Sequence, residues 1–490
     1  MTGDDVTLRD ARVGNDVVDV LIRAGKIVTV GSVNESANTE IQLDGRALLP
    51  GLWDNHVHMT QWSLHSRRPS TFHARSAREA ADTIAAALAA SPVLPPARDG
   101  RPMPFVGTGF RDGLWPDAPS IELLDEAGGG VPIVVVSADL HSVWLNTAAS
   151  ERFGITTDAT GLLREEPAFA IEQRVNDLPE SVLDDWVAEA GRAAARRGVV
   201  GIVDLEIAWN ADPWLRRLRG GFDTQRVEFG VYPHDLERAV TAGLRTGAAL
   251  HELLTVGPLK IMTDGSLGTR TAYCFDEYPG MEGQPGSRGL LAIPPHELRA
   301  LLQRGRRNGF DAAVHAIGDH ANTHALDAFE ELGIPGRIEH AQLLTRTDVD
   351  RLGALGVVAS VQPEHALDDR DITDHHWQGR TDRAFLLQSI LDAGGTLAMG
   401  SDAPVAPLDP WVTIAAAVTR TKDGLAPWHP EEAIDLDSAI RASVRTTIEP
   451  GQPADLVAID ADVTSADAAT LRAMPVALTM LAGRVTHSAL

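Results

Sequence analysis

Short apolar runs alternate with longer, alanine-rich stretches of helical pattern between residues 51 and 449. Continuous apolar runs of this kind are typical of parallel strands buried on both faces, and the stretches between them are typical of connecting helices. The candidate strands are Leu52–His58, Val200–Leu205, Val227–Tyr232, Leu259–Thr263, Ala312–His315, Arg337–His340, Val357–Gln362 and Leu397–Ser401. Eight strands that alternate with helices, among them Trp186–Arg197 and Pro295–Arg307, predict an α/β protein built on a TIM-like (β/α)₈ barrel.

The two ends of the chain carry a different pattern, in which short strand-like runs are separated by glycine-containing turns. Val17–Ile22 and Ile27–Val30 lie near the N-terminus, and Asp455–Ile459 and Val476–Leu481 lie near the C-terminus. Units this small are only marginally stable alone. We therefore expect residues 1–50 and 450–490 to pair into one composite β-sandwich domain, with two independent flaps as the alternative.

The segment from about residue 60 to 179 is too long to be one connection in a compact barrel. It contains strand-like runs of its own, Phe105–Thr108 and Ile133–Val136. We expect the barrel, residues 51–449, to include this segment as an insertion that folds over its mouth.

The composition limits the kinds of partner that we expect the protein to bind. The chain has 43 basic and 68 acidic residues and a formal net charge of −25, which argues against nucleic acid and anionic membranes as partners. A single cysteine excludes an intrachain disulfide and a cysteine-rich zinc site. The N-terminal residues lack the basic and apolar regions of a signal peptide, and no apolar run is long enough to span a bilayer. These features favour a cytoplasmic enzyme with a small-molecule substrate, and they leave homo-oligomer formation open.

His56 and His58 follow an apolar run and are the first sign of a metal site. Residues two apart on a strand face the same side. At the carboxyl end of a first barrel strand, both imidazoles would therefore point into the active-site mouth. Two ordinary core or surface histidines with this spacing also occur by chance, so the pair indicates a metal site only if further candidate ligands accompany it.

Three further strand ends carry side chains that commonly bind metals: His315, His340 and Asp402. Each one alone is explained as a hydrogen-bonded core residue. Together with the first pair they predict a shared metal site, because four histidines and an aspartate lie at successive strand ends. Imidazole and carboxylate ligands suit Zn²⁺ and related divalent ions better than they suit magnesium or calcium.

Lys260 lies in the predicted strand where alternation directs Leu259 and Ile261 to the surrounding helices and the lysine into the barrel. A buried ammonium beside divalent cations is unfavourable unless it is paired or neutralised. Carbamylation by CO₂ would convert the amine into an anion able to bridge two metal ions. An ion pair with a carboxylate such as Asp264 is the alternative.

The order of these residues resembles the binuclear amidohydrolases. Longer strings are similar to the family 3 branch that includes N-substituted formamide deformylase: Leu49–His58, Lys260–Ala272, His315–Asp319, Ile338–Ala341, Gln362-Pro363 with His365, and Gly400–Pro404. The resemblance covers nearly the whole chain. One departure is the segment from Val444 to Gly451, which is shorter than in the family and leaves the packing of the last barrel helix open.

The resemblance implies a metal-dependent hydrolase that cleaves a non-peptide C–N bond, in an amide, an N-substituted formamide or a cyclic amide, by attack of a metal-bound hydroxide. The implied ligands are His56, His58 and Asp402 for one ion, His315 and His340 for a second, and carbamylated Lys260 between them. Asp402 would also act as the catalytic base and then acid, passing a proton to the leaving nitrogen.

Five further residues lie in strings that resemble the family or follow the predicted lysine strand, and substrate contact is expected of them: His141, Trp144, Glu165, Asp264 and Arg270. Solvated loop charge or a packed aromatic side chain explains each of them equally well. For the whole protein, two other functions stay open. One is ester or lactone hydrolysis at the same centre, and the other is a metal-free, non-catalytic scaffold.

Overall fold

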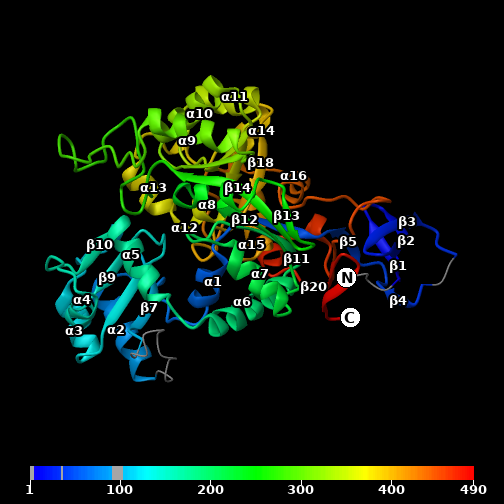
Figure 1. Cartoon of the computed structure of the whole chain (residues 1–490), viewed down its shortest axis with the longest axis horizontal. Helices are drawn as coiled ribbons and strands as arrows, with labels where there is room; N and C mark the ends of the chain where they lie inside the picture. The colour runs from blue at the N-terminus through cyan, green and yellow to red at the C-terminus, as the bar shows by residue number, and fades with distance from the viewer. Residues whose placement is uncertain (1–4, 35–36, 91–102) are drawn as a thin grey trace.

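A computed structural model describes residues 5–34, 37–90 and 103–490 (Figure 1). Its central sheet is a nearly closed parallel barrel, in which each strand is hydrogen-bonded to the next. In sheet order, the strands are β6 (Leu52–Val57), β11 (Val199–Asp204), β12 (Arg226–Val231), β14 (Leu254–Met262), β15 (Ala312–Ala316), β16 (Gly336–His340), β17 (Val358–Val361) and β18 (Thr396–Met399). The eight predicted barrel strands are therefore confirmed, with shifted boundaries.

The barrel closes through its loops rather than through a regular ladder between β18 and β6. Asp402 N–H donates to the His56 carbonyl oxygen at 2.7 Å, and His58 N–H donates to the Ala403 carbonyl oxygen at 2.8 Å. Gly400 allows this close approach, because a Cβ there would lie 2.6 Å from the His56 nitrogen. The seam thus brings the first and last strands together at the carboxyl end of the barrel.

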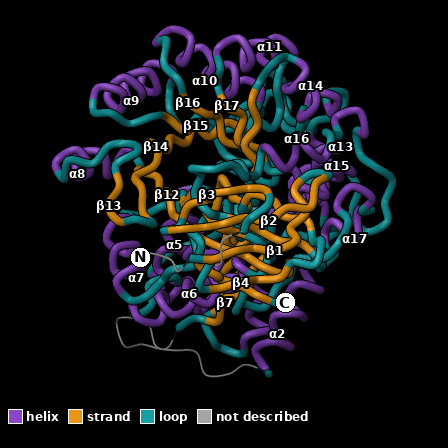
Figure 2. The backbone as a smooth tube through the Cα atoms, turned by 90° about the vertical axis from the view of Figure 1, so that its right-hand side faces the viewer, coloured by secondary structure: helices purple, strands orange, loops and turns teal. Residues whose placement is uncertain are grey.

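Helices surround the barrel (Figure 2), and most of them bury its outward side chains. They are α1 (Met59–His65), α6 (Glu180–Ala195), α7 (Ala211–Arg219), α8 (Leu236–Thr241), α9 (Pro295–Arg307), α10 (Asp319–Leu332), α11 (Arg346–Leu355), α12 (Pro363–Asp368), α13 (Arg370–His376), α14 (Leu387–Asp392), α15 (Pro410–Thr419), α16 (Leu436–Arg441) and α17 (Ala468–Arg472). On β14, Leu259 and Ile261 join this core while Lys260 faces the interior cavity. Along the described residues, no helix has the length and apolarity needed to cross a bilayer.

The short segment after α16 packs directly on the first barrel strand. Trp53 N–H donates to the Ser443 carbonyl oxygen at 2.7 Å, and Leu52 forms an isolated bridge with Val444. Helix α16 is therefore followed at once by backbone contacts to β6.

Strands from both chain ends share one sheet, with the order β21-β20-β19-β5-β1-β2-β3 and β4 paired to β1. Their bounds are β1 (Val6–Val13), β2 (Asp16–Arg23), β3 (Lys26–Gly31), β4 (Thr39–Gln42), β5 (Ala47–Pro50), β19 (Leu456–Ile459), β20 (Val476–Leu481) and β21 (Arg484–Ser488). The junction is the antiparallel pairing of β5 with β19, in which Ala47 lies opposite Ile459. Figure 2 shows this terminal sheet in front of the barrel. Its description as a sandwich stays a prediction.

The insertion folds as a small unit beside the barrel, cyan in Figure 1. Its sheet has the order β10-β9-β8-β7, made of β7 (Phe105–Phe110), β8 (Ile133–Ser137), β9 (Ser142–Leu145) and β10 (Leu162–Arg164). Helices α2 (Ala77–Ala89) and α3 (Ile121–Gly128) share a core with Ile133 and Val135, whereas α4 (Thr147–Phe153) and α5 (Glu166–Val175) share another with Val134 and Val136. Alternation along β8 therefore buries both faces of the sheet. The short strand β13 (Ala249–His251) pairs with β14 outside these units.

Candidate metal centre

Two groups of buried side chains at the carboxyl end of the barrel have the composition of a divalent metal site. One consists of His56, His58 and Asp402, and the other of His340, His365 and Asp402. Within each group the potential ligand atoms lie within 4.8 Å of one another. Asp402 belongs to both, so the two groups adjoin each other.

Glu339 fixes the protonation of His56. The two side chains are joined by a 2.6 Å hydrogen bond between His56 Nδ1 and Glu339 Oε2. Although burial opposes it, the neighbouring charges of Arg337 and His56 hold the pKa of Glu339 well below its usual range. The ionised carboxylate accepts the Nδ1 proton, so His56 presents a bare Nε2, as metal-ligating histidines do.

The bare Nε2 of His56 faces an anion. It lies 3.3 Å from Asp402 Oδ1, and His58 Nε2 lies 3.2 Å from the same oxygen. A lone pair opposite a carboxylate at this distance is repulsive unless a cation or a proton lies between them. The side chains present therefore fit a divalent ion at this position.

His340 is held by a second supporting residue. Its Nδ1 lies 2.8 Å from Gln362 Oε1, and Gln362 Nε2 donates to the Ser360 carbonyl oxygen, which sets the orientation of the amide. The Nδ1 proton thus goes to Gln362, and Nε2 carries the lone pair. Burial lowers the pKa of His340 well below its ordinary value, so the ring is neutral and suited to bind metal.

His315 lies against His340, with the ring centroids 4.5 Å apart. Its Nε2 lies 3.4 Å from the Gly265 carbonyl oxygen and 3.5 Å from Asp264 Oδ1, so this nitrogen faces the loop after β14. Burial lowers the pKa of His315 well below its ordinary value. The neutral ring that donates through Nε2 keeps its lone pair on Nδ1.

His365 was not predicted as a ligand, although it lies in one of the strings that carried the family resemblance. It belongs to α12 rather than to a strand end, and its ring stacks on that of His340 with centroids 6.3 Å apart. His365 Nε2 is buried without a hydrogen-bond partner in the described structure. This unpaired nitrogen, in the same candidate ligand group as Asp402, is the structural sign of a ligand that strand-end reasoning does not detect.

Lys260 is 1% exposed and faces the same cavity. Burial lowers the pKa of its amine to about 8, against the opposing effect of Glu339 and Asp402. No carboxylate lies within ion-pair distance of it in the part of the chain that the structure describes. Asp264, the alternative partner, instead accepts backbone N–H groups from Tyr273, Ile317 and Gly318 at 2.8–3.1 Å.

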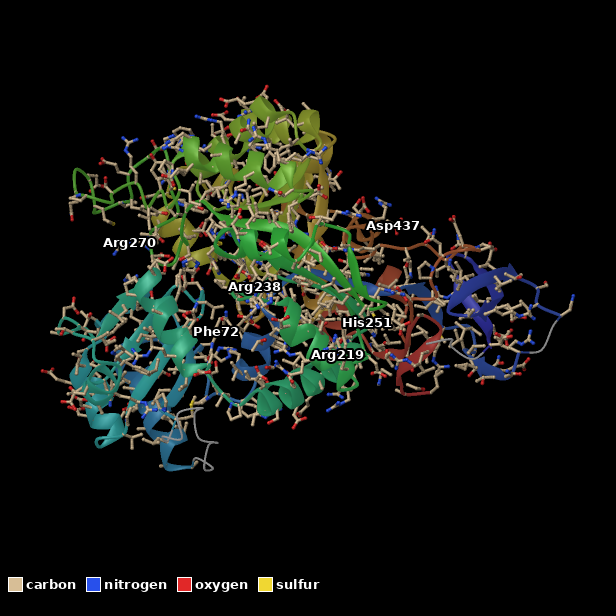
Figure 3. The ribbon with its side chains drawn as sticks, in the orientation of Figure 1. Phe72, Arg219, Arg238, His251, Arg270 and Asp437 are labelled. Carbon is tan, nitrogen blue, oxygen red and sulfur yellow. The ribbon has the colours of Figure 1, made fainter. Side chains whose placement is uncertain are left out.

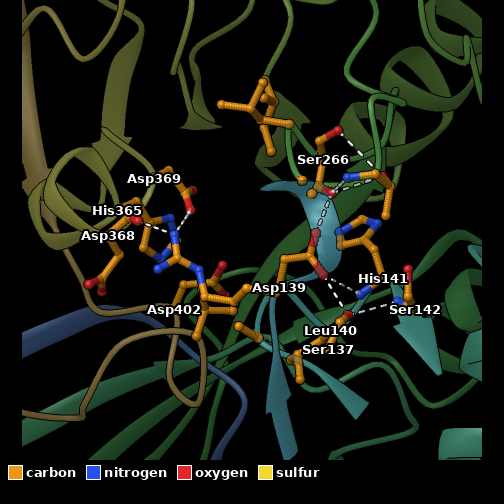
Figure 4. A pocket seen from close by; sticks show the side chains of 18 of the residues that line it. Ser137, Asp139, Leu140, His141, Ser142, Ser266, His365, Asp368, Asp369 and Asp402 are labelled. Carbon is orange, nitrogen blue, oxygen red and sulfur yellow. Dashed lines mark hydrogen bonds and ion pairs between the residues drawn. The ribbon is translucent and has the colours of Figure 1, made fainter. Parts of the chain in front are cut away.

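A cavity of about 360 Å³ lies between the barrel strand ends and the insertion. Figure 4 shows Asp139 and His141 of the insertion on one side, and His365, Asp368 and Asp369 of the barrel on the other. The insertion therefore forms one wall of the space above the candidate ligands.

The structure separates the five residues for which substrate contact was expected. Only His141 lines the cavity; its Nδ1 lies 2.9 Å from Glu165 Oε2, so Glu165 supports it from behind. Trp144 is fully buried in the insertion core and donates to the Ser120 carbonyl oxygen. Asp264 holds backbone groups as described above, and Arg270 lies at the boundary between insertion and barrel, as does Phe72 (Figure 3).

Comparisons with known proteins agree with this arrangement. The sequence model of a family described as "Amidohydrolase family" matches residues 39–487. Protein LONG AFTER FAR-RED 3 of Arabidopsis thaliana is 27% identical, over 89% of this chain and 82% of its own. N-substituted formamide deformylase of Arthrobacter pascens is 24% identical, over 95% of this chain and 94% of its own.

Among solved structures, an uncharacterized metal-dependent hydrolase from Pyrococcus horikoshii OT3 superposes with a TM-score of 0.78. It is 24% identical, and the alignment covers 95% of this chain and 99% of that one. This likeness supports the fold described above over nearly its full length.

Proposed function

Because the chain belongs to the amidohydrolase family, we propose that it is a metal-dependent hydrolase that cleaves a non-peptide C–N bond of an amide or N-substituted formamide. One observation carries the proposal. Two adjoining ligand groups share Asp402 beneath a cavity large enough for a small organic substrate.

Divalent ions, Zn²⁺ in our proposal, would lower the pKa of a bound water and polarise the substrate carbonyl. His56, His58 and Asp402 would hold one ion. His315, His340 and His365 are available to the second, with Lys260 between the two groups as a carbamate. The amine of Lys260, with a pKa near 8, has the free-base fraction that reaction with CO₂ requires.

Asp402 is the residue that favours C–N over C–O cleavage. An amine leaves readily only if its nitrogen is protonated, whereas an alkoxide needs this help less. The Asp402 carboxylate lies between two imidazoles and faces the cavity, so it is placed to accept a proton and return it to a leaving nitrogen. The relative named N-substituted formamide deformylase makes formamides the first substrates to examine.

A matched pair of substrates tests the proposal. Protein purified without chelator should contain divalent metal and hydrolyse N-benzylformamide, and removal of the metal should abolish this activity until zinc is restored. Benzyl formate serves as the matched ester. Turnover of the ester without the amide would replace the proposal with ester hydrolysis, and a folded, metal-free, inactive protein would replace it with a non-catalytic scaffold.

A further inference from the structure

The carboxylates that line the cavity fall into two sets. Three have a cationic partner: Asp112 pairs with Arg164 at 3.0 Å, Asp369 lies 3.4 Å from Arg111, and Asp368 pairs with Lys422. Apart from Asp402 at the metal centre, the remaining lining carboxylates are Asp139, Glu172 and the exposed Asp371, and within the described ranges no cation lies at ion-pair distance from any of them. Two of these three carboxyl groups without a cationic partner, Asp139 and Glu172, therefore lie on the insertion side.

Glu172 is the carboxyl group without a cationic partner whose hydrogen-bonding capacity is least used. It is 6% exposed, lies within α5, and has no hydrogen-bond donor within the described parts of the chain; its Oε1 is buried without a partner. Burial raises its pKa to about 8, with His141 and Arg68 opposing. A carboxyl group in a cavity wall that lacks every donor is an unfilled site for a hydrogen-bonding cation.

Phe169 lies three residues before Glu172 on α5, so the two side chains are neighbours on one helix face. Both line the cavity, and the ring of Phe169 meets that of His141 at a centroid distance of 5.4 Å. In contrast to Phe72, which carries Arg111 at 5.1 Å, the Phe169 ring has no arginine or lysine side chain over its face in the described structure. An aromatic ring beside an unpaired carboxylate is the combination that binds ammonium groups.

Asp139 adds negative charge to the same wall of the cavity. It accepts hydrogen bonds from Ser137 Oγ at 2.6 Å and Ser266 Oγ at 2.7 Å, both neutral donors, so its position is fixed without its charge being cancelled. The cation closest in sequence, His141, is engaged by Glu165 at 2.9 Å. The wall thus keeps an excess of negative charge that a ligand can neutralise.

We propose that the substrate carries a protonated nitrogen, an ammonium or guanidinium group, which binds between the Glu172 carboxylate and the ring of Phe169 while its amide lies at the metal centre. This assignment of substrate class rests on the proposed hydrolase function. It makes Glu172 a specificity-determining residue that acts at a distance from the bond that is cleaved.

The first test compares ω-aminoalkyl formamides of increasing chain length with N-alkylformamides that end in methyl instead of ammonium. At the chain length that spans the cavity, wild-type enzyme should show a KM about tenfold or more lower for the ammonium substrate, with kcat little changed. Equal KM values at every length would overturn the proposal.

Substitutions test whether Glu172 and Phe169 cause the preference for the ammonium substrate. Glu172→Gln should raise the KM of the ammonium substrate about tenfold to hundredfold and change that of the neutral substrate less than about twofold. Asp371→Asn is the matched control, because it removes one lining charge that is exposed and screened, and it should preserve the preference. Phe169→Leu should weaken the preference about threefold to thirtyfold, and it is informative even if Glu172→Gln does not fold.

Calorimetry that measures the binding of benzylammonium and of benzyl alcohol tests the cation site independently of the hydrolase function. Benzylammonium should bind more tightly than the alcohol, and Glu172→Gln should remove the difference, even if no formamide is hydrolysed. Hydrolysis of formamides with no ammonium preference would leave the function standing and refute the cation site. Benzylammonium binding that Glu172→Gln leaves unchanged would also refute it, since the amine would then be ligating the metal.

Discussion

Asp402 is held in place by its backbone as well as by its neighbours. Its N–H group closes the barrel seam onto His56, and its φ of 56° lies in the left-handed region that few residues other than glycine adopt. His340 shares this property, with a φ of 75°. Backbone strain of this kind is concentrated at functional sites, where the surrounding structure maintains it.

Asp402→Asn should lower kcat about a hundredfold to ten-thousandfold, because the amide cannot take up and return a proton. The fold should persist, since the hydrogen bond from residue 402 N–H to His56 is unchanged. Steady-state rates, circular dichroism and metal content should be measured on the same preparation. Near-normal turnover would remove Asp402 from its proposed role.

Lys260→Ala should lose bound metal, because the anion proposed to bridge the two ligand groups is then missing. Short carboxylic acids such as acetate or propionate should restore part of the metal content and activity, and propylamine at the same concentration should not. Metal analysis after gel filtration is the measurement. A full complement of metal in the untreated variant would contradict a bridging role.

Glu172 predicts a dependence of stability on pH. Its pKa of about 8 in the folded protein lies above its value of 4.5 in the absence of burial, so the folded state keeps a proton that the unfolded state releases. The stability contribution is thus present below about pH 4.5 and is lost as pH rises towards 8, by at most about 1.4 kcal/mol per pH unit. Relative to wild type, Glu172→Gln should gain thermal stability between pH 5 and pH 8. If the difference in thermal unfolding midpoint between the variant and wild type stays constant over this range, the result would count against the shifted pKa of Glu172.

Strand-end reasoning could find most of the candidate ligands but not the residues that support them. His56 and His315 stand at the end of apolar runs, and parallel strands bring such ends together whatever their separation in sequence. His365 lies in α12 and Glu339 contacts a residue 283 positions away, so neither role is visible from local pattern. The predicted contact of Trp144 fails for another reason, because an aromatic residue on a strand can face a cavity or a core.

At the scale of elements, the barrel strands could be predicted because burial on both faces makes each of them an apolar run. The insertion could be predicted only in part. Strands β7 and β8 are apolar enough to recognise, whereas β9 and β10 are four and three residues long and are defined by their pairing. Their existence depends on contacts between elements, which local sequence does not encode.

Asn146 illustrates such a contact and gives a prediction for the insertion. Its side chain caps α4 by accepting from Ala149 N–H, accepts from Ile133 N–H, and donates to the Val131 carbonyl oxygen, all at 2.9 Å. Asn146→Ala should destabilise the protein by about 2–4 kcal/mol, because buried backbone groups lose their partners.

Ser76→Ala, which removes the N-cap bond that Glu79 N–H donates on α2, is the comparison and should cost about 1 kcal/mol. Guanidinium unfolding followed by circular dichroism measures both. Equal losses would mean that Asn146 acts as a helix cap and nothing more.

At the scale of the whole molecule, ion pairs join the barrel to the terminal sheet. Arg226 on β12 donates to both carboxylate oxygens of Asp455, at 2.7 and 3.1 Å, and Asp455 also accepts Ala482 N–H. The Asp455 side chain is 2% exposed, so Arg226 pairs with a carboxylate that solvent hardly reaches. The pair therefore links two sheets that are built from distant parts of the chain.

Arg226→Ala should destabilise the protein by about 3 kcal/mol, because it leaves a buried carboxylate unpaired. Arg299→Ala, which breaks an exposed pair with Glu331, should cost less than about 1 kcal/mol. Thermal unfolding of the two variants, with the same metal content, makes the comparison. A similar small loss in both would show that the junction is held by backbone pairing alone.

The junction of β5 with β19 also sets the order in which the protein can be completed during synthesis. Ala47 emerges from the ribosome roughly four hundred residues before Ile459, which at 5–20 residues per second is a delay of about 20–80 seconds. Throughout that time β5 offers an unpaired edge to other nascent chains. We therefore expect β5 to need protection from such contacts until β19 has been made, and slowed translation would prolong the exposure.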